Sequence, residues 1–113
     1  IETRAGLLNT FRTHDAGYTM ITVDMGEPRL GWHEITLSRE VDTLCLPLTA
    51  EGGIKGAVAV SMGNPHAVFF VDHLESIKLA SIGPRLENDA LFPERANISV
   101  AKVETIDKIR LRV

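Results

Sequence analysis

Cysteine is almost absent from this sequence, since Cys45 is the single example among 113 residues. No disulfide can form within the chain and nothing in it indicates secretion, so we expect a cytoplasmic protein. Cys45 lies in the aliphatic stretch 43–48, between two leucines. At such a position we expect a buried cysteine that packs as a small hydrophobic residue and does not act as a nucleophile.

An excess of positive charge is also missing. Lys and Arg number 12 against 15 Asp and Glu, which gives a formal net charge of −3, and the basic residues are scattered. We therefore expect no nucleic acid and no membrane surface among the partners of this protein. No apolar run approaches the roughly 18 residues that cross a bilayer.

Signals for a metal or a bound cofactor are missing as well. His14, His33 and His73 are far apart and lack the spacing of a metal site. Gly52 and Gly53 lack the lysine and the strand-to-helix setting of a phosphate-binding loop. The sequence therefore predicts neither a metal nor a cofactor.

What remains is the composition of an ordinary folded domain, with 44% hydrophobic and 24% charged residues. The chain is long enough to bury a core without disulfides or metals. It begins at Ile1 and not at Met, and the alternating pattern of its last residues runs to Val113 with no stop signal. We expect this chain to be a piece cut from a longer protein.

Strand patterns dominate the sequence. The β-rich runs 6–13 and 18–24 flank a turn-forming segment and predict a hairpin. The connector that follows, 25–31, is rich in glycine and proline and is the best place for a domain boundary. Further strands are expected at 43–48, 55–62, 67–71, 97–103 and 108–113, with one helical turn within 34–40.

The patterns also predict burial and one helix. Residues 67–71 are apolar without alternation, which predicts a strand covered on both faces, and alternation in 108–113 predicts a half-buried strand. Helical spacing of apolar residues predicts one helix between Leu74 and Asn88. Pro84 interrupts this spacing, so the helix either kinks there or restarts with Pro84 in its first turn.

A stiff polar turn precedes strand 67–71. Asn64 lies before a proline, which disfavours the helical region for its backbone, and Pro65 has a fixed φ and no N–H. Asn64 and His66 thus lie on a rigid bend at the mouth of a strand, where a ligand can be held. The residues alone leave other interpretations open: an Asx turn at Asn64, a structural histidine at His66, and a simple strand-boundary residue at Asn97.

Three motifs, in this order, resemble the diaminopimelate epimerase family. They are Val23-Asp24-Met25-Gly26-Glu27-Pro28, Met62-Gly63-Asn64-Pro65-His66 with the apolar run after it, and Gly83-Pro84-Arg85-Leu86-Glu87 leading into Phe92-Pro93-Glu94-Arg95-Ala96-Asn97. Together they extend over nearly the whole chain. The family match favours a ligand-binding interpretation of Asn64, His66 and Asn97.

The resemblance implies an α/β fold of the α+β type, in which a curled, mostly antiparallel sheet surrounds a central helix. Family members have two such domains with the substrate between them. Residues 1–24 would be the closing strands of the N-terminal domain, and residues 25–113 the first part of the C-terminal domain, which would be incomplete here. The helix near Pro84 would be its central helix.

The resemblance also implies the chemistry. Family members interconvert LL- and meso-diaminopimelate without a cofactor, using a thiolate and a thiol on opposite faces of the α-carbon. Asn64 and Asn97 would bind the small-molecule substrate, and His66 would tune one catalytic thiol. Cys45 matches neither catalytic cysteine motif; both of these, and a glutamate and an arginine of the site, would lie outside this chain. We therefore expect the chain alone to be inactive, and the parent protein to be a possible homodimer.

Two rival interpretations remain at this stage. Another isomerase of the same fold, such as a proline racemase or a phenazine-biosynthesis enzyme, would share the strands and the helix but not these paired motifs. A non-catalytic binding or dimerisation module would need no catalytic thiol at all.

Overall fold

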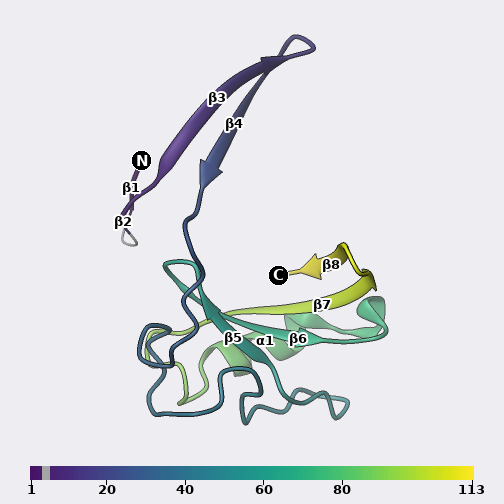
Figure 1. Ribbon diagram of the computed structural model, residues 1–113. Coiled ribbons are helices and arrows are strands. Elements are labelled where there is room, and N and C mark those ends of the chain that lie inside the picture. The colour runs from purple at the N-terminus through teal and green to yellow at the C-terminus, as the bar shows by residue number, and fades with distance from the viewer. Residues whose placement is uncertain (4–5) are drawn as a thin grey trace.

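The computed structural model describes residues 1–3 and 6–113 (Figure 1). Residues 4 and 5, which belong to the predicted segment 1–24, lie outside the described residues. Within the described residues ten elements follow one another: β1 (Glu2–Thr3), β2 (Gly6–Leu7), β3 (Asn9–Asp15), β4 (Tyr18–Asp24), β5 (Val58–Ser61), β6 (Pro65–Phe70), the 3-10 helix η1 (Leu74–Ser76), α1 (Leu79–Glu87), β7 (Asn97–Thr105) and β8 (Lys108–Arg112).

The main body is built on a four-stranded mixed sheet in the order β5-β6-β7-β8. β5 pairs antiparallel with β6, β6 pairs parallel with β7, and β7 pairs antiparallel with β8. The parallel pair needs a crossover, and η1 and α1 supply it. The mixed sheet with its helix confirms the predicted α+β class, and the described sheets are open ones.

α1 is continuous through the glycine and proline that interrupt its sequence pattern. It begins at Leu79 and ends at Glu87, so Pro84 is its sixth residue and the predicted restart at Pro84 is wrong. Pro84 has no N–H to donate to the carbonyl of Ala80, one turn earlier. Packing compensates, because Ile82 and Leu86 are buried and the Arg85 guanidinium donates to the Thr49 carbonyl at 3.2 Å.

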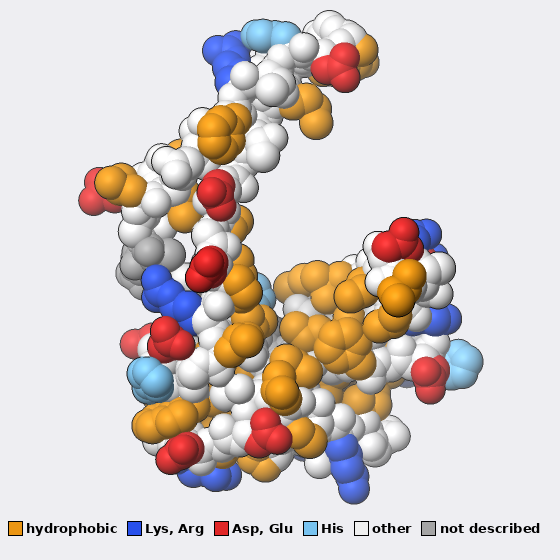
Figure 2. Space-filling model, viewed as in Figure 1, with side chains coloured by type: hydrophobic (Ala, Val, Ile, Leu, Met, Phe, Trp, Pro, Cys, Tyr) orange, Lys and Arg blue, Asp and Glu red, His pale blue; other side chains and the backbone are white. Residues whose placement is uncertain are grey.

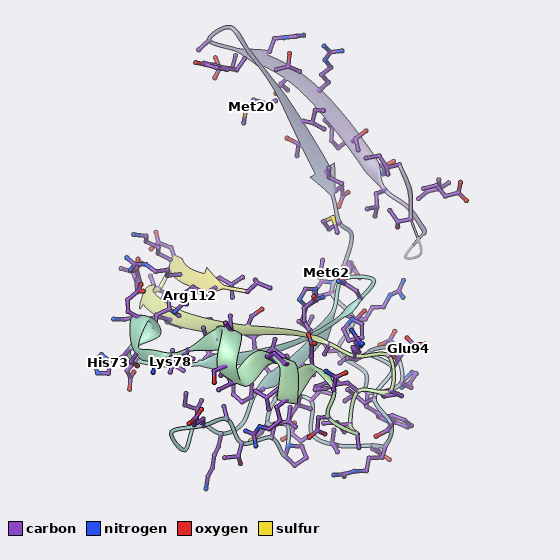
Figure 3. The ribbon with its side chains drawn as sticks, turned by 180° about the vertical axis from the view of Figure 1, so that it is seen from behind. Met20, Met62, His73, Lys78, Glu94 and Arg112 are labelled. Atoms are coloured by element: carbon purple, nitrogen blue, oxygen red, sulfur yellow. The ribbon has the colours of Figure 1, made fainter. Side chains whose placement is uncertain are left out.

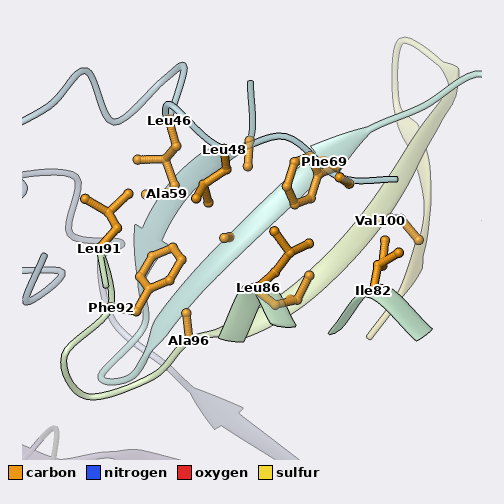
Figure 4. Packing of buried hydrophobic residues seen from close by; sticks show 14 of the residues in the cluster. Leu46, Leu48, Ala59, Phe69, Ile82, Leu86, Leu91, Phe92, Ala96 and Val100 are labelled. Carbon is orange, nitrogen blue, oxygen red and sulfur yellow. The ribbon is translucent and has the colours of Figure 1, made fainter. Parts of the chain in front are cut away.

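The core lies between one face of the sheet and α1 (Figure 4). Phe69 and Val100 are fully buried on neighbouring strands, where they are register partners. Leu46 and Leu48 reach this core from the loop before β5, and Leu91 and Phe92 reach it from the segment before β7. Alanines at 59 and 67 keep the sheet surface low enough for these larger side chains to pack on it.

The predicted strand 43–48 does not form. This stretch is an irregular loop that follows the outer edge of β5, with the Leu46 N–H donating to the Ala57 carbonyl at 2.8 Å. Leu46 and Leu48 are buried in the core, whereas Leu44 is exposed, and Pro47 has no N–H with which to continue a ladder. Cys45 points the other way and is exposed, so the prediction that it is buried is wrong.

The helical turn predicted within 34–40 falls slightly earlier. Its hydrogen bonds run from the Ile35 N–H to the Gly31 carbonyl and from the Leu37 N–H to the Trp32 carbonyl, both at 3.0 Å. Ile35 and Leu37 are buried by this turn, and Trp32 packs against the core.

The second face of the sheet is largely uncovered, which overturns two predictions about burial. Phe70 is 48% exposed, so β6 is not covered on both faces. In β8 the apolar residues Ile109 and Leu111 are 58% and 54% exposed. The half-buried residue there is Arg112, whose guanidinium donates to the Leu74 and Ile77 carbonyls at the end of η1. Figure 2 shows hydrophobic side chains gathered on this face of the body.

The predicted hairpin forms as β3 and β4, paired over their full length and joined at Ala16 and Gly17, but its first strand is Asn9–Asp15, and Gly6–Leu7 pairs with β1 instead. Both turn residues have positive φ, 47° and 82°, as a two-residue hairpin turn requires. Every residue of both strands is exposed, and the hairpin extends away from the main body (Figure 1). Among the described residues no helix is long and apolar enough to span a membrane.

Candidate functional site

The turn before β6 is held by a neighbouring serine. Gly63 has a φ of 103°, a conformation that favours glycine, and its N–H donates to the Ser61 hydroxyl oxygen at 3.2 Å. Ser61 is only 4% exposed and ends β5. The turn therefore presents Asn64 to solvent from a backbone that is tied to the sheet.

Asn64 and His66 are in direct contact. The Asn64 Oδ1 atom lies 3.1 Å from His66 Nε2. A carboxamide oxygen only accepts hydrogen bonds, so this contact is a hydrogen bond when Nε2 carries the ring proton. In the neutral ring that arrangement leaves Nδ1 as a proton acceptor.

Asn97 joins this pair from the neighbouring strand. His66 and Asn97 are register partners in the parallel β6–β7 pair, so both side chains lie on the same face of the sheet. The Asn97 carboxamide Nδ2 also donates to the Pro65 carbonyl at 3.4 Å. The structure thus brings together all three residues that the sequence singled out, at the edge where β6 and β7 begin.

The imidazole of His66 is partly buried, and this burial lowers its pKa from the ordinary value of 6.5. Desolvation penalises the charged form of the ring, so the neutral form is favoured near neutral pH. A neutral imidazole on the same face as two carboxamides offers one proton acceptor together with several hydrogen-bond donors and acceptors. This set suits a ligand with both an ammonium and a carboxylate group.

Residues that hold a metal ion or supply a thiol are not part of this group. No cluster of three His, Cys, Asp or Glu side chains suited to a metal occurs within residues 1–3 and 6–113. Cys45 lies in the loop before β5, where its Sγ is 3.1 Å from the position that a Cβ on Gly56 would take. The amides and the imidazole can bind and orient a ligand by hydrogen bonds.

A hollow of about 580 Å³ lies at the other end of β6. It is lined by Phe70, His73, Lys78 and their neighbours. Figure 3 places His73 and Lys78 at one end of the sheet and Met62 at the other. This hollow therefore does not include the candidate site.

Sequence reasoning assigned no role to Ser61 or to the residue that pairs with it. The Arg29 N–H donates to the Ser61 carbonyl at 2.9 Å, and the Ser61 N–H donates to the Arg29 carbonyl at 3.0 Å. Arg29 lies in the connector that follows the hairpin, so this isolated bridge joins the connector to the turn. A serine two residues before a glycine is a common pattern, so the sequence could not indicate that Ser61 holds this turn.

The open mixed sheet, the helix on one face and the amide–imidazole group on the other make this an α+β domain with a polar site at the sheet edge. A family model described as diaminopimelate epimerase matches residues 58–113. The chain belongs to the diaminopimelate epimerase family.

Individual relatives agree with this family assignment. A protein named diaminopimelate epimerase from Acidiphilium cryptum is 51% identical over 113 residues, which is 100% of this chain and 39% of the relative. Its namesake from the Wolbachia of Drosophila simulans is 52% identical over 107 residues, 95% of this chain and 39% of the relative. That from Rhodospirillum centenum is 50% identical over 113 residues. The chain thus spans about two fifths of the length of the curated relatives it matches.

Proposed function

We propose that this chain is a segment of a bacterial, cytoplasmic enzyme that interconverts LL- and meso-2,6-diaminopimelate without a cofactor, in lysine and peptidoglycan biosynthesis. The observation that carries the proposal is the contact between Asn64 and His66, with Asn97 on the same face, in a chain about half identical to proteins of that name. The parent protein, meaning the full-length gene product that contains this segment, is the active species. This chain alone is inactive.

The proposed domain division follows the connector. Residues 1–24 are assigned to the N-terminal domain and residues 25–113 to the C-terminal domain. The hairpin supports this division, since none of its residues is buried against the four-stranded sheet. The chain turns out of the hairpin and into the connector at Asp24, whose carboxylate accepts a hydrogen bond from the Gly26 N–H at 2.9 Å.

The reaction requires a base and an acid on opposite faces of the α-carbon. A thiolate takes the α-proton from one face, the electron pair of the broken C–H bond stays on carbon, and a thiol on the other face donates its proton to that carbon. The second sulfur is then the thiolate, so the reverse reaction uses the same two groups. Both thiols are proposed to come from parts of the parent protein outside residues 1–113, since Cys45 is exposed in a loop and is not one of them.

The residues of this segment bind the substrate and tune one sulfur. Asn64 and Asn97 are proposed to hydrogen-bond the ammonium and carboxylate groups at the reacting centre, because a carboxamide both donates and accepts. His66, neutral through burial, is proposed to accept a proton from the adjacent thiol or to adjust its pKa. The substrate is the one partner proposed with a role in catalysis; a homodimer is a proposed assembly, and nucleic acid and membranes are not proposed as partners.

The test is an assay of the parent protein with LL-diaminopimelate and no added pyridoxal phosphate. Formation of the meso isomer, with solvent deuterium entering at the α-carbon, is the expected result. A purified, folded parent protein that leaves LL-diaminopimelate unchanged would contradict the proposal. L-Proline serves as the control substrate, and turnover of proline in place of diaminopimelate would favour a racemase of the same fold.

A further inference from the structure

Ser61 occupies a position that links the connector, the sheet and the candidate site. Its side chain is buried at the end of β5, and its hydroxyl oxygen accepts the hydrogen bond from the Gly63 N–H. Its backbone N–H and carbonyl both bond to Arg29. One residue is therefore tied on one side to the connector after the hairpin and on the other side to the turn that carries Asn64.

The turn needs such a tie. Gly63 has a positive φ and Asn64 is exposed, so neither residue is held by packing. Pro65 has no N–H, and the first register pair of β5 and β6 is Ser61 with Pro65. The hydrogen bond from the Gly63 N–H to the Ser61 hydroxyl thus ties the loop between the two strands back to β5. Figure 3 places Met62, the residue between them, where the connector reaches the main body.

We infer that Ser61 is a positioning residue, whose hydroxyl fixes the Gly63–Asn64 turn so that the Asn64 carboxamide is held for both His66 and the ligand. This inference rests on the function proposed above as far as the ligand is diaminopimelate. Ser61 itself is buried on the opposite face from His66 and does not touch the ligand, since neighbouring residues in a strand alternate between faces. Its effect on catalysis passes through Asn64.

The experiment compares Ser61→Ala, Asn64→Ala and the double variant in the parent protein. Ser61→Ala removes one hydrogen bond and loosens the turn, so kcat/KM is expected to fall about tenfold, mainly through a higher KM. If Ser61 acts through Asn64, adding Ser61→Ala to Asn64→Ala costs little more. Ser61→Thr keeps the hydroxyl and restores most of the activity. Ser76→Ala is the control for loss of a serine hydroxyl away from the turn, because Ser76 ends η1 and its hydroxyl donates to the His73 carbonyl at 2.8 Å.

A second readout does not depend on activity. Hydrogen exchange at the Gly63 amide is expected to be faster in Ser61→Ala and unchanged in Ser61→Thr and Ser76→Ala. Unchanged exchange at Gly63 in Ser61→Ala, or a full tenfold further loss of kcat/KM in the Asn64→Ala background, would overturn the inference. A parent protein without epimerase activity would overturn the proposed function instead, and the Gly63 exchange rates would still decide whether Ser61 fixes the turn.

Discussion

Asn64 Oδ1 and His66 Nε2 lie 3.1 Å apart across the proline that separates the two residues in sequence. Pro65 is the first residue of β6, so its two neighbours lie on the same face of the extended chain. The carboxamide oxygen then fixes which ring nitrogen of the neutral histidine holds the proton. The groups proposed to bind the ligand and to accept a proton are thereby positioned by one short turn.

Replacement of Asn64 tests the binding role of that turn. Asn64→Ala in the parent protein is expected to lower kcat/KM for LL-diaminopimelate about a hundredfold, because a hydrogen bond to a charged group and the partner of His66 are both lost. Asn88→Ala is a suitable control, since Asn88 lies at the end of α1 and donates to the Pro84 carbonyl. Steady-state kinetics measure both variants. An unchanged kcat/KM in Asn64→Ala would refute the assigned role.

His66 predicts a pH dependence of stability. Burial lowers the pKa of His66 in the folded protein below the value of 6.5 that it has in the unfolded chain. At a pH between the folded and the unfolded pKa, the unfolded chain therefore binds more protons than the folded protein. The free energy of unfolding is therefore unaffected by this group above pH 6.5, and it decreases as the pH drops from 6.5 towards the lower pKa of the folded protein. Urea unfolding of the parent protein at pH 7.5 and 5.5 should show this loss, and His66→Gln should reduce it. His73→Gln, at an exposed histidine beyond β6, provides the control; a pH dependence that His66→Gln leaves intact would count against the burial effect.

Two adjacent phenylalanines test the asymmetry of the sheet. Phe69 is fully buried against α1, whereas Phe70 is 48% exposed on the other face. Phe69→Ala is expected to lower the free energy of unfolding by about 3–5 kcal/mol, because it leaves a cavity in the core. Phe70→Ala should cost less than about 1.5 kcal/mol, since much of its surface is already in water. Equal losses in urea unfolding of the parent protein would mean that another part of that protein covers the second face.

Sequence patterns predicted the main elements because glycine and proline residues mark the turns and the ends of these elements. The hairpin has Gly17 at its turn, β6 begins at Pro65, and β7 begins shortly after Pro93. Those patterns placed Asn64, His66 and Asn97 at strand starts, but only the parallel pairing of β6 with β7 brings them to one edge.

Burial was harder to predict, since it depends on what lies opposite a residue. The loop 43–48 has the leucine spacing of a strand, yet it satisfies its backbone by following β5 and leaves Cys45 in solvent. The last strand alternates as predicted, but Arg112 is the residue that packs, because the carbonyls of Leu74 in η1 and of Ile77 just after it accept from its guanidinium. Neither the contact of loop 43–48 with β5 nor that of Arg112 with these carbonyls can be read from the local sequence pattern.

The hairpin tests the proposed division into domains. An isolated two-stranded hairpin is marginally stable in water, and both faces of β3 and β4 are exposed here. In the 113-residue chain its amides are expected to exchange with solvent much faster than those of β6 and β7. In the parent protein, where residues 1–24 would complete an N-terminal domain, the same amides should become protected. Hydrogen-exchange mass spectrometry measures both, and a hairpin equally unprotected in the parent protein would contradict the proposed boundary.

The last prediction concerns the chemistry of the chain on its own. Racemisation at the α-carbon needs two acid or base groups on opposite faces, and the one thiol here, Cys45, is exposed in a loop. The 113-residue chain is therefore expected to catalyse no exchange of the α-proton of diaminopimelate with deuterated water, as followed by NMR. The parent protein under the same conditions is the positive control, and its Cys45→Ser variant should exchange the proton at the wild-type rate. Catalysed exchange by the 113-residue chain, or loss of exchange in the parent Cys45→Ser variant, would show that Cys45 or another group of this segment acts as a catalytic base.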